Sequence, residues 1–571
     1  MSSTAAPTNA KQADRDARAA PNSGSTARAS AVMAAGTVVS RVLGLVRTAL
    51  LATAIGASAG VSDLFSYANA LPNFIYLMVA GGVFNAVLVP QIVRASRQPD
   101  RGADYVSRIL TLSVAALLAL TVVVTLAAPL IINAATRFTG SNLALATAFA
   151  YWCLPQIFFY GLYAVLGQIL NANGSFGPYM WAPVVNNLVS IGALVVFLSL
   201  MGAEQSEGYT PETWTPEHTF LLAGGMTLGV ALQALLLFLP LRRLKLGLKP
   251  KFGLHGTGLG RTGRLASVTI VTMLVGNGLY FVNLYVATIA SDSRQALTDQ
   301  GRPARIAGLA NLDIGAMVYQ LPHAVITLSL ATVMFNQLSA AYAGGNLPEV
   351  RAVLSRGLRV TGVATVFGAA ALLAFAGPLG MLFSESPEVA TLNGIIIAIL
   401  AVGAPFLSAN FLLGRVFYAG EDVKTPLKIQ LILSGVGVVL AVFAGMLDPR
   451  LIVPALAAAY SLGNVIAVVI SHLFLARAIG PYGAGQVFDV HVRFTVAGLV
   501  AALAGTAVSW AFGGYDAGGY LWQSKFHALV VLAVGGVVMG AVYLGMLKLL
   551  RVAELGQLAG SLQMLVRRGR N

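Results

Sequence analysis

The chain of 571 residues is poor in charge: only 10% of its residues are Asp, Glu, Lys or Arg, while 57% are hydrophobic and the mean hydropathy is +0.78. A water-soluble domain could not bury that much apolar surface. The scarcity of charge therefore excludes an ordinary soluble protein and indicates one that crosses a membrane many times.

Cysteine and histidine are scarce as well. The single cysteine, Cys153, lies in an apolar run, which excludes a disulfide framework and a thiol metal site. The six histidines show no metal-binding spacing, and no phosphate-binding G-x-x-x-x-G-K-[ST] motif is present. The G-x-S-x-G pattern at 56–60 links two apolar runs instead of following a strand. We therefore expect a transporter with no catalytic residues, no metal and no cofactor.

Acidic residues are outnumbered by basic ones, 21 to 36, which gives a net charge of +15. Most of the basic residues lie in segments that share one side of the membrane if both termini are cytoplasmic, and few, among them Arg294 and Lys525, lie on the other. This distribution follows the positive-inside rule, so it predicts cytoplasmic termini and no nucleic-acid partner.

Apolar runs of about 20 residues predict about fourteen transmembrane helices. We expect two parallel six-helix lobes followed by two further helices. The expected segments are a disordered cytoplasmic tail (1–29), an N-lobe (30–240), a basic cytoplasmic linker (241–264), a C-lobe (265–476), two C-terminal spans (477–550) and an amphipathic basic tail (551–571).

An internal repeat supports the two lobes. A Leu-Pro pair followed by a Phe-Asn pair occurs in the second expected span and again about 250 residues later, at Leu71-Pro72, Phe84-Asn85, Leu321-Pro322 and Phe335-Asn336. Parallel repeats of this kind are typical of transporters that bind substrate between two lobes. Chance recurrence in an apolar chain is the alternative interpretation.

Two arginines, Arg41 and Arg47, lie inside the first expected span, although a charge at the bilayer centre costs about 2.5 to 3.5 kcal/mol. Their spacing puts them about 120° apart around a helix and about 9 Å apart along it. Both can therefore reach one wide cavity, where guanidinium groups would bind the diphosphate of an anionic substrate. Snorkelling, or pairing with Asp63, is the alternative.

The second span contains the predicted gating residues Asp63, Pro72, Gly81 and Gly82. Asp63 begins the span, so it can cap the helix or form a gating ion pair, and both interpretations stay open. Proline and the two glycines make the helix able to bend, as alternating access requires.

Polar residues elsewhere in these spans are candidate site residues. We assign Asn73 and Asn85 to substrate binding, and Asp313, Gln320 and His323 to a polar lining or an ion contact, with a structural hydrogen-bonding role as the alternative for the last three. The basic linker and the C-terminal tail alternate basic and apolar residues, which predicts contact with anionic phospholipids, or else with a protein partner.

The segment SRVLGLVR at 40–47, the LPN at 71–73 and the block RVFYAGEDVKTPLKI at 415–429 resemble the lipid II flippase family (MurJ, also called MviN). The resemblance implies membership of the multidrug/oligosaccharidyl-lipid/polysaccharide exporter superfamily. It also implies movement of undecaprenyl-diphosphate-linked peptidoglycan precursor, lipid II, to the outer leaflet of a bacterial plasma membrane, in support of cell-wall synthesis and cell shape.

Carried over residue by residue, the family's functional arginines fall on Arg41 and Arg47 and its aspartate on Asp63. The chain departs from the family's charged positions at Thr48, Tyr76, Leu77, Gly81 and Met317. These departures imply a cavity that is less cationic than the family pattern.

Three other functions stay open at this point. The chain could move another lipid-linked glycan, or export drugs in exchange for Na⁺ or H⁺, on the same fold. It could also act without transport, as a scaffold for cell-wall synthesis or division proteins. An antiporter would need an essential acidic residue such as Asp313, whereas a flippase would need the two arginines of the first span.

Overall fold

The computed structural model describes residues 23–57, 60–77, 102–203, 209–253, 259–300, 305–384, 386–516 and 518–554. These residues are almost entirely helical and include no strand, which confirms the predicted all-α class. The predicted site residues Gly81, Gly82 and Asn85 lie outside the described residues.

The N-terminal group of helices corresponds to the first six expected spans. α2 begins at Ser23, whereas the sequence placed the start of this span at residue 30. The group comprises α2 (Ser23–Ile55), α3 (Gly60–Tyr76), α5 (Ala103–Leu126), α6 (Ala128–Ala135), α7 (Gly140–Cys153), α8 (Gln156–Ala172), α9 (Phe176–Met201), α11 (Pro216–Thr219), the π-helical turn η3 (Phe220–Gly224), α12 (Gly225–Leu235) and α13 (Phe238–Arg243).

The C-terminal group contains the next six expected spans, and two long helices follow it. The group comprises α14 (Leu259–Asp299), α15 (Leu309–Tyr319), the π-helical turn η4 (His323–Thr327), α16 (Leu328–Ala343), α17 (Leu347–Ala374), α18 (Ala376–Leu382), α19 (Pro387–Ala419), α20 (Lys424–Gly445) and α21 (Pro449–Ile479). The helices that follow are α22 (Ala484–Ala511) and α23 (Lys525–Leu549), joined by the short 3₁₀ turn η5 (Tyr520–Trp522).

Twelve helical segments among the described residues are long and apolar enough to cross a membrane. The other two expected spans are the second, which contains α3 and is described as far as residue 77, and the eighth, the segment α15–η4–α16, which is interrupted near Pro322. The twelve long helices and these two interrupted or partly described spans together are roughly consistent with the predicted fourteen spans.

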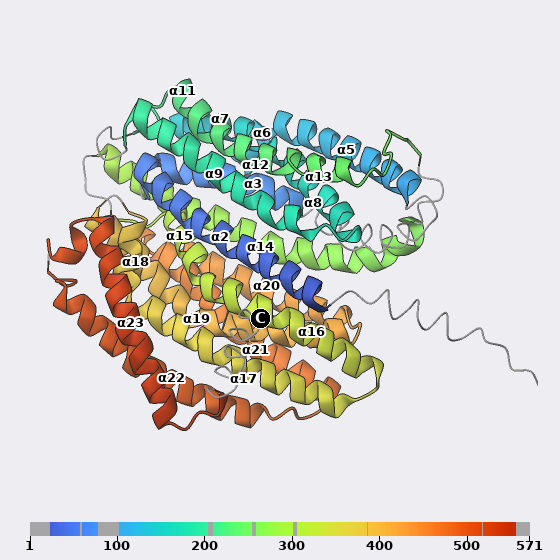
Figure 1. Ribbon diagram of the computed structural model, residues 1–571. Helices are drawn as coiled ribbons and strands as arrows, with labels where there is room; N and C mark the ends of the chain where they lie inside the picture. The colour runs from blue at the N-terminus through green and yellow to red at the C-terminus, as the bar shows by residue number, and fades with distance from the viewer. Residues whose placement is uncertain are drawn as a thin grey trace, which may run out of the picture.

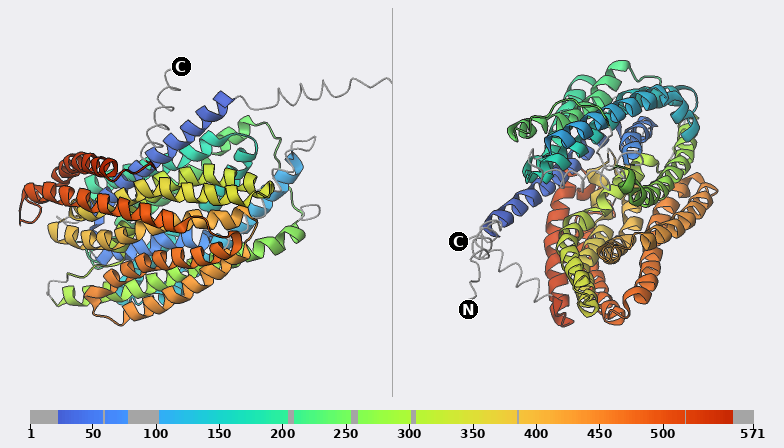
Figure 2. Two further views of the ribbon diagram at one scale, coloured as in Figure 1. Left: turned by 90° about the horizontal axis from the view of Figure 1, so that it is seen from below. Right: turned by 90° about the vertical axis from the view of Figure 1, so that its right-hand side faces the viewer.

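The two groups lie side by side as separate halves of one bundle (Figure 1). The halves stay distinct in the end-on view on the right of Figure 2. α22 and α23 pack against each other, and they contact the C-terminal group through α17 and α18. The predicted architecture of two lobes and two added helices is confirmed, and we call the halves the N-lobe and the C-lobe.

Local sequence explains where several helices begin. Asn346, Ser386, Asp448 and Ser524 each precede a helix, and each side chain accepts a hydrogen bond from a backbone N–H of the first turn. These caps satisfy backbone donors that have no partner within the helix. Proline follows directly or one residue later at three of them, where its missing N–H costs nothing.

Among the residues that the structure describes, the apolar cluster that joins the two lobes lies at one end of the bundle. We call the end where α2 stops and α3 starts the Asp63 end, and the opposite end, where α13 stops and α5 starts, the Arg242 end. The largest buried cluster lies at the Asp63 end and joins residues of both lobes, such as Leu64, Phe149, Leu309 and Ile396. At the Arg242 end one cluster contains only N-lobe residues and another only C-lobe residues.

Candidate substrate cavity and gate

Asp63 forms a buried ion pair with Arg294 at the Asp63 end. Asp63 lies in the first turn of α3 and Arg294 lies in α14, so the pair joins the two lobes. The side chains are 1% and 5% exposed, respectively. Burial of this kind is expensive unless each charge is paired and its remaining polar atoms are hydrogen-bonded.

Further donors complete the shell of the Asp63 carboxylate. Ser291 Oγ donates to Asp63 Oδ2, and the backbone N–H of Ala310, at the start of α15, donates to Oδ1 over 2.9 Å. Arg294 also donates to the carbonyl oxygen of Ile306 over 3.3 Å. The carboxylate therefore binds α14 and the start of α15 at the same time, which favours the ion-pair interpretation of Asp63.

Gly308 makes room for this carboxylate. A Cβ atom placed on Gly308 would lie 2.1 Å from Asp63 Oδ2, much closer than two such atoms can approach. The backbone φ of Gly308 is −112°, which any residue can adopt. Glycine is therefore required here because a side chain would clash with the Asp63 carboxylate, and not because of the backbone conformation.

The contact between α3 and α14 continues toward the middle of the bundle. Phe74 of α3 stacks on Tyr280 of α14 with ring centroids 5.2 Å apart, and it meets Phe281 edge-on at 4.0 Å. These rings lie about 16 Å along α3 from Asp63. The lobes are therefore in contact from the Asp63 end to about half the depth of the bundle.

A second contact between the lobes is made by Lys525, the first residue of α23. Its ammonium group donates to Thr53 Oγ1 over 2.6 Å and to the carbonyl oxygen of Ala49 over 3.2 Å, both in α2. Because α23 packs with the C-lobe and α2 with the N-lobe, this lysine ties the lobes together near the Asp63 end.

Sequence reasoning missed the roles of Arg294 and Lys525. It assigned both to loops, whereas α14 extends to Asp299 and α23 starts at Lys525 itself. Arg294 is 231 residues from its partner, so no local pattern connects them. The sequence did hold one signal that could have found the pair: Asp63 and Arg294 have opposite charges and lie at the same predicted end of two different apolar spans.

Arg41 and Arg47 lie in α2 and have electrostatic neighbours in different lobes. Arg41 is exposed and is an electrostatic neighbour of His323 in η4 of the C-lobe. Arg47 is half-buried and is an electrostatic neighbour of Tyr160 in α8 of the N-lobe. This agrees with the separation of about 120° around the helix. Both guanidinium groups are thus held on the helix that lines the boundary between the lobes.

Thr48 and Met317 contact each other across the same boundary. Thr48 Oγ1 donates to the Gly44 carbonyl oxygen over 3.0 Å and lies 3.3 Å from Met317 Sδ. These are two of the positions at which the chain departs from the charged family pattern. A neutral contact between α2 and α15 therefore stands next to Arg47.

The other predicted residues of the second span are placed as follows. Pro72 is buried within α3, which continues past it to Tyr76. Asn73 is exposed on the same helix. Asn85, Gly81 and Gly82 lie outside the described residues, so their assigned roles stay predictions.

Asp313 lies half-buried in α15, inside the C-lobe. Its electrostatic neighbours include Tyr280 of α14 and Tyr460 of α21. Among the residues that the structure describes, no Lys or Arg lies within ion-pair distance of its carboxylate. A carboxylate in this position needs a proton or a bound cation to offset the loss of water.

Gln320 and His323 flank the interruption in the eighth span. Gln320 is exposed and donates to the carbonyl oxygen of Ala316, one turn back in the same helix. His323 Nδ1 lies 3.1 Å from Ser408 Oγ of α19, and the ring packs edge-on against Phe411. Each of these side chains therefore has a hydrogen-bond partner in the C-lobe, and the choice between a polar lining or ion contact and a structural role stays a prediction.

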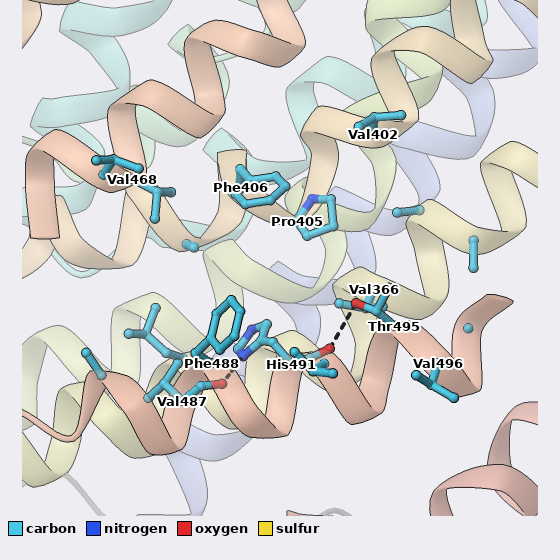
Figure 3. A pocket seen from close by; sticks show the side chains of 18 of the residues that line it. Val366, Val402, Pro405, Phe406, Val468, Val487, Phe488, His491, Thr495 and Val496 are labelled. Atoms are coloured by element: carbon cyan, nitrogen blue, oxygen red, sulfur yellow. Dashed lines mark hydrogen bonds between the residues drawn. The ribbon is translucent and has the colours of Figure 1, made fainter.

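An apolar pocket of about 700 Å³ lies in the C-lobe between α17, α19, α21 and α22 (Figure 3). Phe406 of α19 and Phe488 of α22 project into it from opposite sides, and Val468 of α21 also lines it (Figure 3). Its lining residues include two histidines but no Lys, Arg, Asp or Glu. The pocket suits a hydrocarbon chain and does not suit a diphosphate.

Comparison with known proteins agrees with the resemblance seen in the sequence. The family described as lipid II flippase MurJ matches residues 51–526. A lipid II flippase MurJ of Burkholderia cenocepacia is 28% identical over 408 residues, which cover 69% of this chain and 73% of that protein. A probable lipid II flippase MurJ of Rhizobium meliloti is 26% identical over 423 residues, which cover 72% of this chain and 74% of that protein.

Solved structures share the fold. A lipid II flippase MurJ in an inward closed conformation superposes with a TM-score of 0.66 at 19% identity, over 91% of this chain and 99% of that one. A multidrug resistance MATE family transporter of the MOP superfamily, in an inward-facing conformation, gives a TM-score of 0.60 at 16% identity, over 78% and 95%.

Proposed function

The chain belongs to the lipid II flippase MurJ family, and we propose that it moves lipid II from the inner to the outer leaflet of a bacterial plasma membrane by alternating access. It is a multi-pass membrane transporter and not an enzyme. The observation that carries the mechanism is the Asp63–Arg294 ion pair, which joins the lobes at the Asp63 end, whereas no other ion pair among the described residues joins them.

The proposed orientation puts the Arg242 end in the cytoplasm. Basic residues gather in the loops at that end, and the positive-inside rule favours such loops on the cytoplasmic side. The shared core at the Asp63 end and the separate cores at the Arg242 end then describe a transporter that is closed toward the outside. Opening to the outside would break the ion pair of Asp63 and the contact of Lys525 with α2.

Arg41 and Arg47 are the proposed ligands of the lipid diphosphate. Guanidinium groups keep their charge and bind phosphate oxygens through paired N–H donors. The neutral Thr48 and Met317 next to Arg47 leave these two arginines as the main cations contributed by α2. The apolar pocket of Figure 3 has no such charge, so the diphosphate would stay near α2.

Asp313 is the proposed site of ion coupling. Its carboxylate lies inside the C-lobe without a basic ion-pair partner among the described residues, so it can take up H⁺ or Na⁺. A membrane potential supplies about 2.3 kcal/mol per charge per 100 mV, which is enough to bias a two-state equilibrium.

The test is lipid II flipping by purified chain in proteoliposomes. Replacing both Arg41 and Arg47 with glutamine should lower the flipping rate at least tenfold, because hydrogen bonds to a charged group contribute about 1.5 to 3 kcal/mol each. Arg477→Gln with Arg493→Gln is the matched control, because both residues are exposed arginines of the C-terminal half. The control pair should flip lipid II at the wild-type rate.

Depletion of the protein in its native cell then identifies the substrate. Accumulation of lipid II on the inner leaflet is the expected result. Accumulation of a different lipid-linked glycan would replace the proposed substrate and leave the mechanism in place. Full flipping by the double arginine variant would contradict the proposed diphosphate site.

A further inference from the structure

A second groove lies at the Arg242 end, between α5 and the segment that follows α13. It has a volume of about 690 Å³. Its floor is apolar and comes mainly from α5 and α13, with Leu110, Val114, Leu118, Phe238 and Leu241 among the lining residues. It differs from the pocket of Figure 3 because three basic residues, Arg242, Lys245 and Lys249, also line it.

Hydrogen bonds fix the wall of this groove onto α5. The backbone N–H of Lys249 donates to Ser107 Oγ over 3.2 Å, and that of Lys251 donates to Thr111 Oγ1 over 3.0 Å. Lys251 Nζ also binds Asp104 Oδ1 at 2.5 Å, and Arg108 binds the other oxygen of the same carboxylate at 2.8 Å. The segment that follows α13 is therefore fixed against α5 and forms an ordered wall of the groove.

The three basic side chains of the groove are available to a ligand. Arg242, Lys245 and Lys249 are exposed, and none has an ion-pair partner among the residues that the structure describes. Lys245 has a φ of 50°, a left-handed conformation that is costly for a residue with a Cβ atom. Glycine would adopt this conformation at a lower energetic cost. The presence of lysine therefore favours a role for its side chain at the rim of the groove.

The dimensions match one leaflet of a bilayer. Residues 107 to 118 of α5 line the groove, a length of about 16 Å along the helix. Half of the hydrocarbon thickness of a membrane is about 15 Å. Lys249 is bonded through its backbone N–H to Ser107 at one end of this length, and the exposed Leu118 lies at the other, so a headgroup and an acyl chain would both find matching surroundings.

We propose that this groove binds an anionic phospholipid of the cytoplasmic leaflet, with its phosphate at Arg242, Lys245 and Lys249 and one acyl chain along α5. The apolar floor selects a lipid, and the three cations select one with net negative charge. The site is separate from the arginines of α2 and needs no lipid II, so it stands apart from the proposed flippase mechanism.

The experiment is titration of the full-length protein with phosphatidylglycerol or phosphatidylcholine, followed by native mass spectrometry. The wild type should bind phosphatidylglycerol more tightly than phosphatidylcholine. Arg242→Gln, Lys245→Gln and Lys249→Gln combined should weaken that binding at least tenfold, because each cation near an anionic lipid changes affinity about five-fold. Phosphatidylcholine binding should change little.

Two further variants separate the groove from general charge and from the acyl-chain contact. Arg356→Gln, Arg477→Gln and Arg493→Gln remove the same charge from exposed positions of the C-terminal half, and they should leave binding near wild type. Ala115→Trp fills the groove and keeps all three cations, and it should also weaken binding. Equal losses in the two triple variants, or unchanged binding in Ala115→Trp, would overturn the proposal.

Discussion

The carboxylate of Asp63 and the guanidinium of Arg294 meet in the interior of the bundle and connect helices of different lobes. Ser291 and the Ala310 N–H bind the same carboxylate, so the pair is fully hydrogen-bonded on its acidic side. Removing one member of a buried pair costs about 3 to 5 kcal/mol, since the other charge stays buried without compensation. We therefore expect the pair to set how strongly the lobes stay closed at this end.

Asp63→Asn should open the Asp63 end. The amide keeps the shape of the side chain but removes the negative charge that faces Arg294, and the conformation that exposes Arg294 to water becomes favoured by up to about 3 to 5 kcal/mol. Ala307 lies beside the gate and is 3% exposed, and the native Cys153 is buried. A maleimide should therefore label an Ala307→Cys reporter at least tenfold faster when Asp63→Asn is also present.

Glu388→Gln is the control for that experiment. Glu388 pairs with Arg305 at the same end of the bundle, but the side chains are 71% and 75% exposed, so the pair contributes at most about 1 kcal/mol. Its loss should leave the labelling rate unchanged. Slow labelling in Asp63→Asn would show that the ion pair does not hold the gate closed.

Gly308→Ala should disrupt the same gate through space alone. The new Cβ would lie on the Asp63 carboxylate, so the carboxylate must leave its donors on α14 and α15. We expect lipid II transport to fall in Gly308→Ala and, to about the same extent, in Asp63→Asn, because neither variant can keep the carboxylate on its donors. The measurement is lipid II flipping, with Gly414→Ala as the control because nothing lies within 4 Å of its new Cβ.

A double variant separates this clash from general damage at Gly308. Asp63→Ser shortens the side chain and removes the group that a Cβ on residue 308 would meet. Asp63→Ser combined with Gly308→Ala should then flip no more slowly than Asp63→Ser alone. A further loss in the double variant would mean that Gly308 matters for a reason other than the carboxylate.

Lys525 and Thr53 should be energetically coupled. Lys525→Met removes the charge and keeps the length of the side chain, and Thr53→Val removes the hydroxyl that accepts its 2.6 Å hydrogen bond. Each variant should lower the midpoint of thermal denaturation in detergent. The effects should be less than additive in the double variant by about 1 kcal/mol, since both remove one interaction.

Lys548→Met tests whether any lysine of α23 would behave in this way. Lys548 is exposed in the last turn of the same helix, and its replacement should leave the midpoint unchanged. Strict additivity of Lys525→Met and Thr53→Val would contradict a direct role for the contact between α23 and α2.

Sequence predicted the parts of the site that depend on position along one helix. Arg41 and Arg47 were recognised because charges inside an apolar run are rare, and helical spacing gave their separation. The repeat was also visible, but its two prolines behave differently: α3 continues past Pro72, whereas α15 ends at Tyr319 before Pro322. The neighbours of each proline decide this, and they come from distant parts of the chain.

The gate could not be assembled from sequence for a related reason. Arg294 and Lys525 lie near helix ends, where charged residues are common. The sequence alone therefore does not distinguish them from loop residues. Only the packing of α3 on α14, and of α23 on α2, turns them into partners of Asp63 and Thr53. Gly308 was hidden for the same reason, because its role is to leave space for a side chain from another helix.

Asp313→Asn should uncouple transport from the ion gradient and leave lipid II binding intact. The amide cannot take up H⁺ and binds Na⁺ far more weakly than a carboxylate does, while the arginines of α2 are unchanged. Flipping in proteoliposomes should lose its response to imposed Na⁺, H⁺ and voltage gradients. Asp489→Asn, at an exposed carboxylate of α22, is the control and should keep the wild-type response. A full gradient response in Asp313→Asn would assign coupling to another group, and loss of lipid II binding would move Asp313 into the substrate site.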